Sequence, residues 1–356
     1  MRILLIINEL LYTCGVSSHT YNLLSGLKDR NNIDLYLLCG GGNAIEKFNN
    51  LNIPIIINEN FKHESRSIKG YTRAVKFLYQ LVKDKNIDII HSHHHYAASI
   101  AHKVSLLTET STVLTNHGIL AEVGHLNHFA ADYLIVVNEH VVDYLVSKKI
   151  KYQNSIRLIR NGIPIKDADR KYNIDKLKIL AASRLVPTKG LDIYIRAVSL
   201  LPIEMCSRAE FYIAGEGFYE KELQNINTEL KTNISFLGRI TDLNKILNDF
   251  DVFVIPTSSD SEGFPMTIIE AGMNKNLIIS SNFWGLEYVF ENEKHGLVFE
   301  IGDYQGLAKI IEMAINNFEN MSKYIENFHS KVKSIFNIET MIENTIKYYE
   351  DILLVK

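Results

Sequence analysis

The stretch Leu177-Lys-Ile-Leu-Ala-Ala-Ser-Arg-Leu-Val-Pro-Thr-Lys-Gly190 is typical of a buried strand that leads through a loop into a helix. The apolar run Leu177–Ala182 has the length of a strand, and a helix is predicted from Gly190. Arg184 and Lys189 stand five residues apart in the loop, so both cations can reach one point at the carboxyl end of the strand. A guanidinium fork and an ammonium group together suit a diphosphate, although two exposed basic residues on a loop would show the same spacing.

The same alternation of apolar strands and helices recurs along most of the chain. In the first half the predicted strands are Ile3–Ile7, Leu35–Leu38, Pro54–Ile57, Ile87–His91, Thr112–Thr115, Tyr133–Val137 and Ile156–Ile159, and the predicted helices are Ser17–Leu27 and Ser67–Lys85. In the second half, strands are predicted at Leu177–Ala182, Glu210–Ala214, Ile234–Phe236, Val252–Ile255 and Leu277–Ser280, and helices at Gly190–Leu201, from Tyr219, at Leu243–Asn248, at Thr267–Asn274 and from Tyr304 onward. Unbroken apolar strands between helices indicate parallel sheets covered on both faces.

The predicted fold class is therefore α/β, with two Rossmann-like doubly wound parallel-sheet domains that face a central cleft. We place the first domain at residues 1–165 and the second at 166–337, because the hydrophilic stretch Lys166–Lys176 is the best candidate for a linker.

Composition narrows the class of protein. Hydrophobic residues make up 46% of the 356 positions and charged residues 22%, which is ordinary for a soluble globular protein. The three cysteines lie far apart, so they predict neither a disulfide framework nor a zinc site and fit a reducing compartment. The apolar run at the N-terminus is too short for a signal peptide, and no run approaches the about 18 apolar residues of a membrane span. We expect a cytoplasmic protein.

Charge is divided unevenly along the chain. Residues 1–165 carry 17 Lys and Arg against 13 Asp and Glu, whereas the remaining residues carry 21 against 28. The basic first half could face an anionic surface, and the acidic second half disfavours nucleic acid as a partner.

A second motif, Ser258-Ser-Asp-Ser-Glu-Gly-Phe-Pro-Met-Thr-Ile-Ile-Glu270, places two carboxylates eight positions apart. If Pro265 opens a helix, Glu262 lies in the preceding loop and Glu270 about one and a half turns inside. Both acids would then face one ligand at a helix N-terminus, where backbone N–H groups favour an anion. A sugar joined to a diphosphate fits this arrangement. A solvated loop acid and a helix-surface acid are the alternative.

Gly215-Glu-Gly217 lies between a predicted strand and a predicted helix. Glu220 occupies the third glycine position of a dinucleotide fingerprint, so hydride chemistry is disfavoured. A tight turn is the simpler interpretation, and nearby contacts to a nucleotide remain open.

Histidines follow two of the predicted strands. In His91-Ser-His-His-His95 adjacent imidazoles diverge and no carboxylate stands at ligand spacing, so we predict no metal site there. His93, His94 and His117 nevertheless come after apolar runs, where a doubly wound domain places its site residues. Hydrogen-bonded structural histidines are the competing interpretation.

A basic stripe is predicted on one face of the helix at 67–85. It consists of Arg66, Lys69, Arg73 and Lys76, with aromatic residues between them. Such a stripe can lie on an anionic lipid surface, although a solvated helix face is the commoner explanation.

Taken in order, these motifs resemble the family 4 retaining glycosyltransferases of the GT-B fold, from Met1 to about Leu307. The resemblance is carried by Cys14-Gly-Val16, Asp88-Ile-Ile-His-Ser-His-His-His95, Thr115-Asn-His-Gly118, Arg160-Asn-Gly-Ile-Pro164, Ser183-Arg-Leu-Val-Pro-Thr-Lys-Gly190, Ile213-Ala-Gly-Glu-Gly217, Phe236-Leu-Gly-Arg239 and the pair Glu262 and Glu270. The sequence departs from the family pattern at Cys14, where a glycine is common, and in Asn282-Phe-Trp-Gly285, where small residues are usual.

The resemblance implies roles for individual residues. Arg184 and Lys189 would hold the diphosphate of the donor, Glu270 would bind the ribose hydroxyls, and Glu262 and His117 would contact the transferred sugar. Glu262, His117, Arg184 and Lys189 are the implied catalytic residues. The further implied donor-binding residues are Gly15, Val16, Gly215, Gly263, Phe264 and Pro265. His93, His94 and the basic stripe would lie on the side of the acceptor or the membrane.

The resemblance also implies an activity. The expected enzyme moves a hexose or N-acetylhexosamine, with retention, from a nucleotide-diphosphate sugar (a UDP-sugar is favoured) to a surface-glycan or polyprenyl-linked saccharide. It would need no metal or other cofactor and would work at the inner face of the cell membrane. The first domain would bind the acceptor and the second the nucleotide sugar, with a C-terminal helix at about 338–356 packed back on the first. The alternatives are a non-catalytic glycan-binding partner subunit of a transferase and a sugar-nucleotide epimerase of the same fold.

Overall fold

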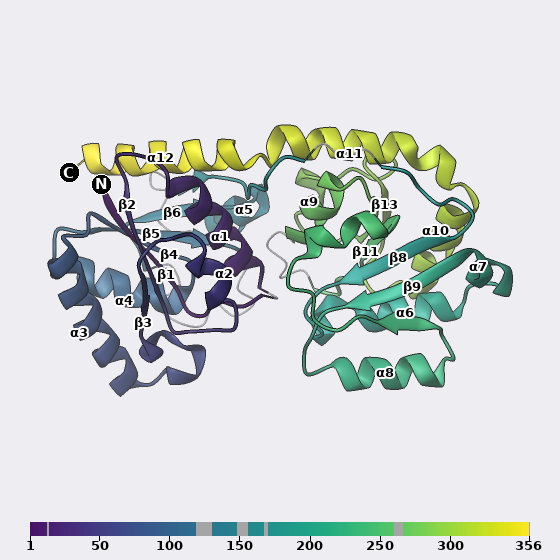
Figure 1. Ribbon diagram of the computed structural model, residues 1–356, viewed down its shortest axis with the longest axis horizontal. Helices are drawn as coiled ribbons and strands as arrows, with labels where there is room; N and C mark the ends of the chain where they lie inside the picture. The colour runs from purple at the N-terminus through teal and green to yellow at the C-terminus, as the bar shows by residue number, and fades with distance from the viewer. Residues whose placement is uncertain (13, 119–129, 148–155, 167–169, 260–265, 356) are drawn as a thin grey trace. The chain divides into compact units, whose positions relative to one another are not determined.

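The chain forms two compact units in the computed structural model, which describes residues 1–12, 14–118, 130–147, 156–166, 170–259 and 266–355. Unit 1 comprises Met1–Gly162 together with Ile338–Lys356, and unit 2 comprises Ile163–Asn337. Each unit is a parallel β-sheet with helices packed on its faces (Figure 1). The predicted fold class, two doubly wound α/β units, is confirmed.

Unit 1 contains a seven-stranded sheet among its described residues, with strand order β3-β2-β1-β4-β5-β6-β7. Its strands are β1 (Arg2–Ile7), β2 (Asp34–Cys39), β3 (Ile55–Ile57), β4 (Ile89–Ser92), β5 (Ser111–Asn116), β6 (Tyr133–Val136) and β7 (Ile156–Leu158). Its α-helices are α1 (Gly15–Leu27), α2 (Ile45–Asn49), α3 (Ile68–Lys85), α4 (His95–Ser105), α5 (Glu139–Ser147) and α12 (Ile338–Leu354). Because β4 pairs in parallel with both β1 and β5, the carboxyl ends of these three strands lie next to one another.

Both faces of the unit 1 sheet are buried. Along β1, Ile3 and Leu5 enter the core that α1 and α12 cover, whereas Leu4 and Ile6 enter the core that α3 and α4 cover. All four side chains are fully buried, and each such burial stabilises the fold by about 1.5–3 kcal/mol. This explains why the strand is an uninterrupted apolar run rather than an alternating one.

The last helix, α12, packs against the first, α1, within unit 1 (Figure 1). A Cβ built on Gly26 of α1 would lie only 2.4 Å from Cγ1 of Ile342, so a glycine at this position lets the two helices approach closely. Tyr349 and Ile342 of α12 are fully buried in the core beneath.

Unit 2 contains a six-stranded sheet among its described residues, with strand order β10-β9-β8-β11-β12-β13. Its strands are β8 (Leu177–Ala182), β9 (Ala209–Ala214), β10 (Ile234–Phe236), β11 (Val252–Ile255), β12 (Leu277–Ser281) and β13 (Leu297–Phe299). Its α-helices are α6 (Leu191–Ser199), α7 (Ile203–Arg208), α8 (Glu220–Glu229), α9 (Met266–Met273), α10 (Tyr304–Asn316) and α11 (Ser322–Ile335).

Two local predictions for unit 2 are wrong. The helix predicted at Leu243–Asn248 is a pair of 3₁₀ turns, Leu243–Lys245 and Leu247–Asp249. Part of the expected linker instead packs within unit 2, because Tyr172 donates a hydrogen bond to the Lys275 carbonyl at 2.7 Å and Arg170 is buried beside Asp251. The Arg170 guanidinium lies 3.7 Å from that carboxylate and offsets the cost of burying it.

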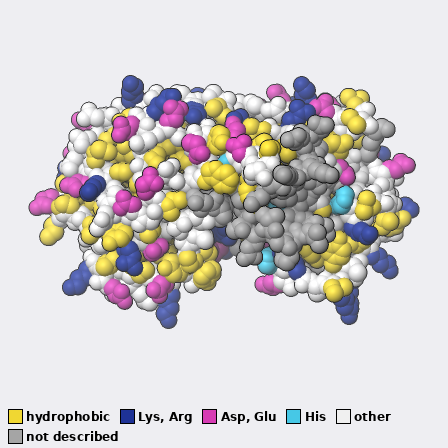
Figure 2. Space-filling model, turned by 180° about the vertical axis from the view of Figure 1, so that it is seen from behind, with side chains coloured by type: hydrophobic (Ala, Val, Ile, Leu, Met, Phe, Trp, Pro, Cys, Tyr) yellow, Lys and Arg dark blue, Asp and Glu magenta, His cyan; other side chains and the backbone are white. Residues whose placement is uncertain are grey.

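Charged side chains of both signs are interspersed over the described surface seen in Figure 2. Within the described ranges, none of the helices combines the length and the apolar character that crossing a bilayer requires.

Candidate functional site

Two histidines mark the carboxyl edge of the unit 1 sheet. His93 directly follows β4 and His117 directly follows β5, the neighbouring strand. The backbone N–H of His93 donates to the Ile6 carbonyl of β1 at 3.0 Å, which fixes this loop against the sheet. The strand order thus brings the two predicted site histidines together.

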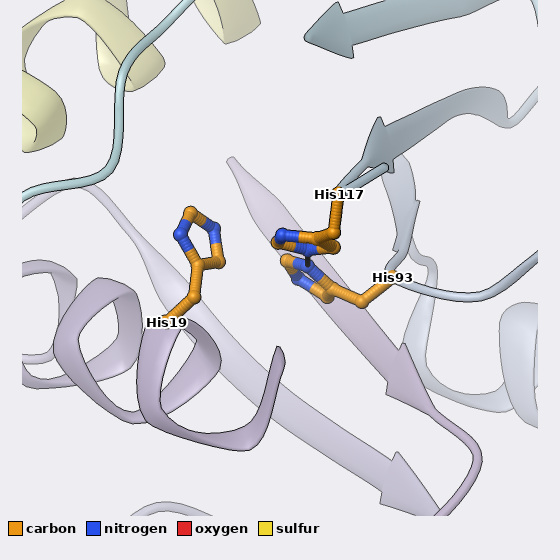
Figure 3. Close-up of side chains that lie close together, drawn as sticks. All are labelled: His19, His93 and His117. Atoms are coloured by element: carbon orange, nitrogen blue, oxygen red, sulfur yellow. Dashed lines mark hydrogen bonds between the residues drawn. The ribbon is translucent and has the colours of Figure 1, made fainter. Parts of the chain in front are cut away.

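A third histidine joins them from α1. His19 lies one turn into this helix, and Figure 3 shows its ring turned toward the stacked rings of His93 and His117. The ring centroid of His19 is 4.7 Å from that of His117 and 5.4 Å from that of His93. We call His19, His93 and His117 the histidine triad.

Hydrogen bonds orient the triad. Nδ1 of His93 lies 3.2 Å from Nε2 of His117, so one ring donates and the other accepts. Nδ1 of His19 donates to the amide oxygen of the buried Asn161 at 2.9 Å. This leaves Nε2 of His19 as the nitrogen that bears a lone pair.

Burial keeps the triad neutral. It lowers the pKa of His19 to about 4 and, together with the proximity of the other imidazoles, holds the pKa of His93 and of His117 well below the usual value. Near pH 7 these rings are therefore uncharged and can each donate one hydrogen bond and accept another.

His91 connects the triad to the C-terminal helix. Its Nδ1 lies 2.5 Å from the hydroxyl of Tyr349, and its Nε2 lies 2.6 Å from Oγ1 of Thr115. Its ring stacks at 4.4 Å on that of His93. Burial lowers the pKa of His91 to about 3, so this ring is neutral as well.

The histidine run 91–95 is divided among three environments rather than forming one loop. His91 lies in β4, His94 is the N-cap residue of α4, and His95 is the first residue of that helix. Nδ1 of His94 accepts a hydrogen bond from the Asn8 N–H at 3.3 Å. As expected from the spacing, adjacent members diverge, and His93 is the member that meets His19 and His117.

The remaining predicted residues of unit 1 lie at the start of α1. Gly15 is the first residue of this helix and is exposed, whereas Val16 is half-buried and packs against the core beneath α1. Their predicted contact with phosphate stays a prediction.

The predicted basic stripe is only partly on a helix. Lys69, Arg73 and Lys76 lie exposed on one face of α3. Arg66 precedes the N-cap residue Ser67, so its placement on that face was wrong; its guanidinium instead lies over the ring of Tyr96 at 5.1 Å. The prediction failed because Ser67 caps the helix by accepting from the Gly70 N–H, which starts the helix after Arg66.

Beside this stripe, α3 and α4 border a mostly apolar groove of about 360 Å³. It is lined by Tyr71, Thr72, Val75, Lys76, Tyr79, Lys103 and Leu107.

The carboxyl edge of the unit 2 sheet is built from loops that hold one another. Leu185, after β8, donates its N–H to the Glu216 carbonyl after β9 at 2.9 Å. Ser258, after β11, donates its N–H to the Thr188 carbonyl at 3.0 Å. Gly190 adopts φ +63°, and a Cβ there would lie 1.9 Å from the Pro256 carbonyl oxygen. The three loops therefore form one continuous edge.

Arg184 and Lys189 lie on this edge: Arg184 comes two residues after β8, and Lys189 ends the 3₁₀ turn Pro187–Lys189. The Arg184 side chain is exposed and makes no hydrogen bond or ion pair with any described residue. Lys189 is half-buried just before the N-terminus of α6. Gly215 adopts φ +140°, and a Cβ there would lie 1.9 Å from the carbonyl oxygen of Ser183, in the loop that carries Arg184.

Glu270 lies in α9, a little over one turn after Met266, and is half-buried. Glu262, Gly263, Phe264 and Pro265 lie outside the described residues.

Sequence analysis assigned no role to His19 or Tyr349, and Asn161 was noted only as part of the motif Arg160-Asn-Gly-Ile-Pro164. His19 gives no local signal, because a histidine on an amphipathic helix is ordinary. The strand order 2-1-4-5 would have pointed to it, since that order places the end of β1 beside the ends of β4 and β5.

Two family models match nearly the whole chain. The model described as Glycosyltransferase Family 4 matches residues 13–167, and the model described as Glycosyl transferases group 1 matches residues 164–331. An uncharacterised glycosyltransferase of Methanocaldococcus jannaschii is 25% identical over 358 residues, which covers 96% of this chain and 95% of that protein. A second relative is the UDP-Gal:α-D-GlcNAc-diphosphoundecaprenol α-1,3-galactosyltransferase of Escherichia coli, 25% identical over 309 residues, or 78% of this chain and 79% of that one.

Solved structures share the fold. The crystal structure of Anabaena HepE in complex with UDP-glucose superimposes with a TM-score of 0.82 at 17% identity, over 99% of this chain and 100% of that one. The two sheets and the two family matches lead to one conclusion: this chain belongs to glycosyltransferase family 4 and has the GT-B fold.

Proposed function

We propose that this glycosyltransferase moves a hexose or N-acetylhexosamine from a nucleoside-diphosphate sugar to a lipid-linked or surface-glycan saccharide, with retention of anomeric configuration. The observation that carries the proposal is Arg184. Its guanidinium is exposed and unpaired among the described residues, and it stands at the carboxyl end of β8 five residues from Lys189.

The electrostatics of this edge favour a diphosphate. A guanidinium can bind two phosphate oxygens at once, and an ammonium group adds a second positive charge. The N-terminus of α6 follows directly after Gly190 and contributes the positive end of the helix dipole. In this proposal unit 2 binds the nucleotide sugar, with Glu270 on the ribose hydroxyls and Gly215 close to the nucleotide.

The reaction needs stabilisation of the leaving group. The bond between the anomeric carbon and the β-phosphate oxygen breaks while an acceptor hydroxyl forms a new bond on the same face of the sugar. The proton of that hydroxyl passes to the departing phosphate oxygen. Arg184 and Lys189 offset the negative charge that develops on the diphosphate. Glu262 and the neutral His117 hold the transferred sugar by hydrogen bonds, and no metal is required.

The acceptor side of the proposal rests on the relatives. The Escherichia coli relative is named for a UDP-Gal donor and an acceptor linked to undecaprenyl diphosphate, and the Anabaena structure contains UDP-glucose. We therefore favour a UDP-sugar as donor and assign the acceptor to unit 1, on the side of His93 and His94. Contact of α3 with an anionic membrane through Lys69, Arg73 and Lys76 would bring the enzyme to such an acceptor.

The donor can be identified with purified protein. A panel of UDP-glucose, UDP-galactose, UDP-GlcNAc, UDP-GalNAc and GDP-mannose should contain one compound that raises the melting temperature clearly above the others, because a ligand that binds only the native state stabilises it. That donor is then incubated with polyprenyl-diphosphate saccharides in EDTA, and the anomeric configuration of the product is read by NMR.

The outcomes separate the candidate functions. A retained linkage formed in EDTA supports the proposal. Change of the donor sugar without any acceptor would identify an epimerase instead. Binding of saccharide with no turnover of any donor would identify a non-catalytic partner subunit.

A further inference from the structure

We propose that the histidine triad of unit 1 is a binding site for a divalent cation that prefers nitrogen ligands, with Zn²⁺ the best match. The triad supplies three imidazoles, from α1 and from the loops after β4 and β5. One ring nitrogen of each lies within 4.8 Å of the corresponding nitrogens of the other two.

The spacing is close to that of a tetrahedral zinc site. Zinc–nitrogen bonds of about 2.0–2.1 Å place two ligand nitrogens about 3.4 Å apart. Nδ1 of His93 and Nε2 of His117 are already 3.2 Å apart. A cation can therefore replace the hydrogen bond between them once both rings turn so that their lone pairs converge on it. The ligand nitrogen of His19 lies no more than 4.8 Å from the other two, so its ring must shift by up to about 1.4 Å to reach the tetrahedral spacing.

Asn161 prepares His19 for this role. Its amide oxygen accepts the Nδ1 proton of His19, which fixes the tautomer whose Nε2 carries a lone pair. Figure 3 shows that the His19 ring faces the other two rings rather than the exterior of the cluster. Metal-binding histidines depend on this kind of second hydrogen bond for their orientation.

Polar atoms beside the triad are buried without a hydrogen-bond partner among the described residues. Nε2 of His93, a residue only 2% exposed, is buried without a hydrogen-bond partner among the described residues. Nδ2 of Asn116 and Oγ of Ser92, next in sequence to His117 and His93, are likewise buried and unpaired in that part of the chain. Each buried polar atom of this kind costs free energy unless water or another bound group pairs with it.

The ligand set selects the class of cation. Three neutral nitrogens suit Zn²⁺, Cu²⁺ and Ni²⁺, whereas Mg²⁺ and Ca²⁺ prefer oxygen ligands. His117 is the half-buried member of the triad, so a cation and its fourth ligand, a water, would enter from its side. A bound cation would take the lone pair of Nε2 of His117, so this nitrogen could no longer accept a hydrogen bond. If the proposed contact of His117 with the sugar also holds, zinc would inhibit transfer.

Metal titration of EDTA-stripped protein tests the site directly. Zn²⁺ is titrated against a chromophoric chelator, and Co²⁺ is added separately to record its visible absorption, which is intense only for tetrahedral coordination. The wild type should bind one equivalent of each. His19→Gln and His93→Gln should lose this binding, and Asn161→Ala should weaken it by about 10–100-fold.

His63→Gln is the matched control, since His63 is exposed in a 3₁₀ turn and lies outside the triad. It should bind both metals as the wild type does. Circular dichroism and melting curves without metal establish that each variant is folded. Zinc should then raise the melting temperature of the wild type and of the control, but not that of the two triad variants.

Absence of stoichiometric binding in the wild type, or binding that survives in both triad variants, overturns the proposal. Activity distinguishes it from the proposed function. Zinc that binds without inhibiting transfer supports the site and counts against the sugar contact of His117. Transfer that proceeds in a protein without zinc affinity supports the function and overturns the site.

Discussion

The hydroxyl of Tyr349 in α12 lies 2.5 Å from Nδ1 of His91 in β4, and both side chains are fully buried. His91 also contacts Oγ1 of Thr115 and stacks on His93. A helix at the far end of the sequence therefore completes the hydrogen bonding behind the histidine triad.

Tyr349→Phe should lower the free energy of unfolding by about 1–3 kcal/mol, because it leaves Nδ1 of His91 buried without a partner. Urea unfolding measures the change. Tyr133→Phe is the control, since Tyr133 is half-buried in β6 and its hydroxyl makes no hydrogen bond to a described residue. An equal decrease in the free energy of unfolding of the two variants would show that the hydrogen bond to His91 contributes nothing to stability.

Arg184→Ala and Lys189→Ala should each reduce transfer on the order of 10²-fold, because each removes a positive charge that stabilises the leaving diphosphate. Arg184→Ala should leave the melting temperature without ligand unchanged, because the Arg184 side chain is exposed and unpaired among the described residues. Glu262→Ala should likewise reduce transfer by well over tenfold. Steady-state kinetics with the identified donor measures these effects. Arg196→Ala, in the exposed last turn of α6, should keep wild-type kinetics. Unchanged turnover in any of the three variants would remove that residue from its proposed role.

Gly215→Ala should cost more stability than Gly238→Ala. Both glycines have positive φ, so both variants carry backbone strain of about 1–3 kcal/mol. A Cβ at Gly215 would in addition lie 1.9 Å from the Ser183 carbonyl oxygen, whereas none of the described atoms lies within 4 Å of one at Gly238. The collision would displace the loop that carries Arg184, so donor affinity should fall only in Gly215→Ala. Chemical unfolding and donor titration measure both effects, and similar affinities would contradict the prediction.

Acidification should destabilise unit 2 through His295. Burial lowers the pKa of this ring from 6.5 to about 4, and its Nδ1 accepts a hydrogen bond from the Glu291 N–H. Between pH 6.5 and 4 the unfolded chain therefore holds a proton that the native ring lacks, and stability falls as pH falls through this window. The loss is on the order of 1 kcal/mol at pH 5, allowing for solvent screening.

Melting curves at pH 7 and pH 5 check this effect. His295→Gln should lose less stability than the wild type on acidification, whereas His63→Gln, at an exposed position, should lose as much. A wild-type response in His295→Gln would exclude the ring as the source.

The sequence predicts central strands such as β1 and β11 well, because each contains a continuous apolar run buried on two faces. The strand β13 (Leu297–Phe299) was missed, although the equally short β10 was predicted. The helix at Leu243–Asn248 was predicted wrongly, since its apolar spacing fits a helix whereas the segment forms two separate three-residue turns.

The site was harder to predict than the fold. His93, His117, Arg184 and Lys189 could be predicted as edge residues, because each follows an apolar strand. His19 could not, since its position depends on which strands are neighbours. That order is set by long-range pairing of β1 with β4 and of β4 with β5, which leaves no local trace in the sequence.

The packing of α12 on unit 1 has a consequence for biosynthesis. Domains generally fold as they leave the ribosome, N-terminal part first. Here the α1 side of the first sheet lacks Met341, Ile342 and Tyr349 until all of residues 163–337 have been translated. The unit that is made first is therefore finished last, and its nascent form presents an uncovered apolar surface for most of the time that translation takes.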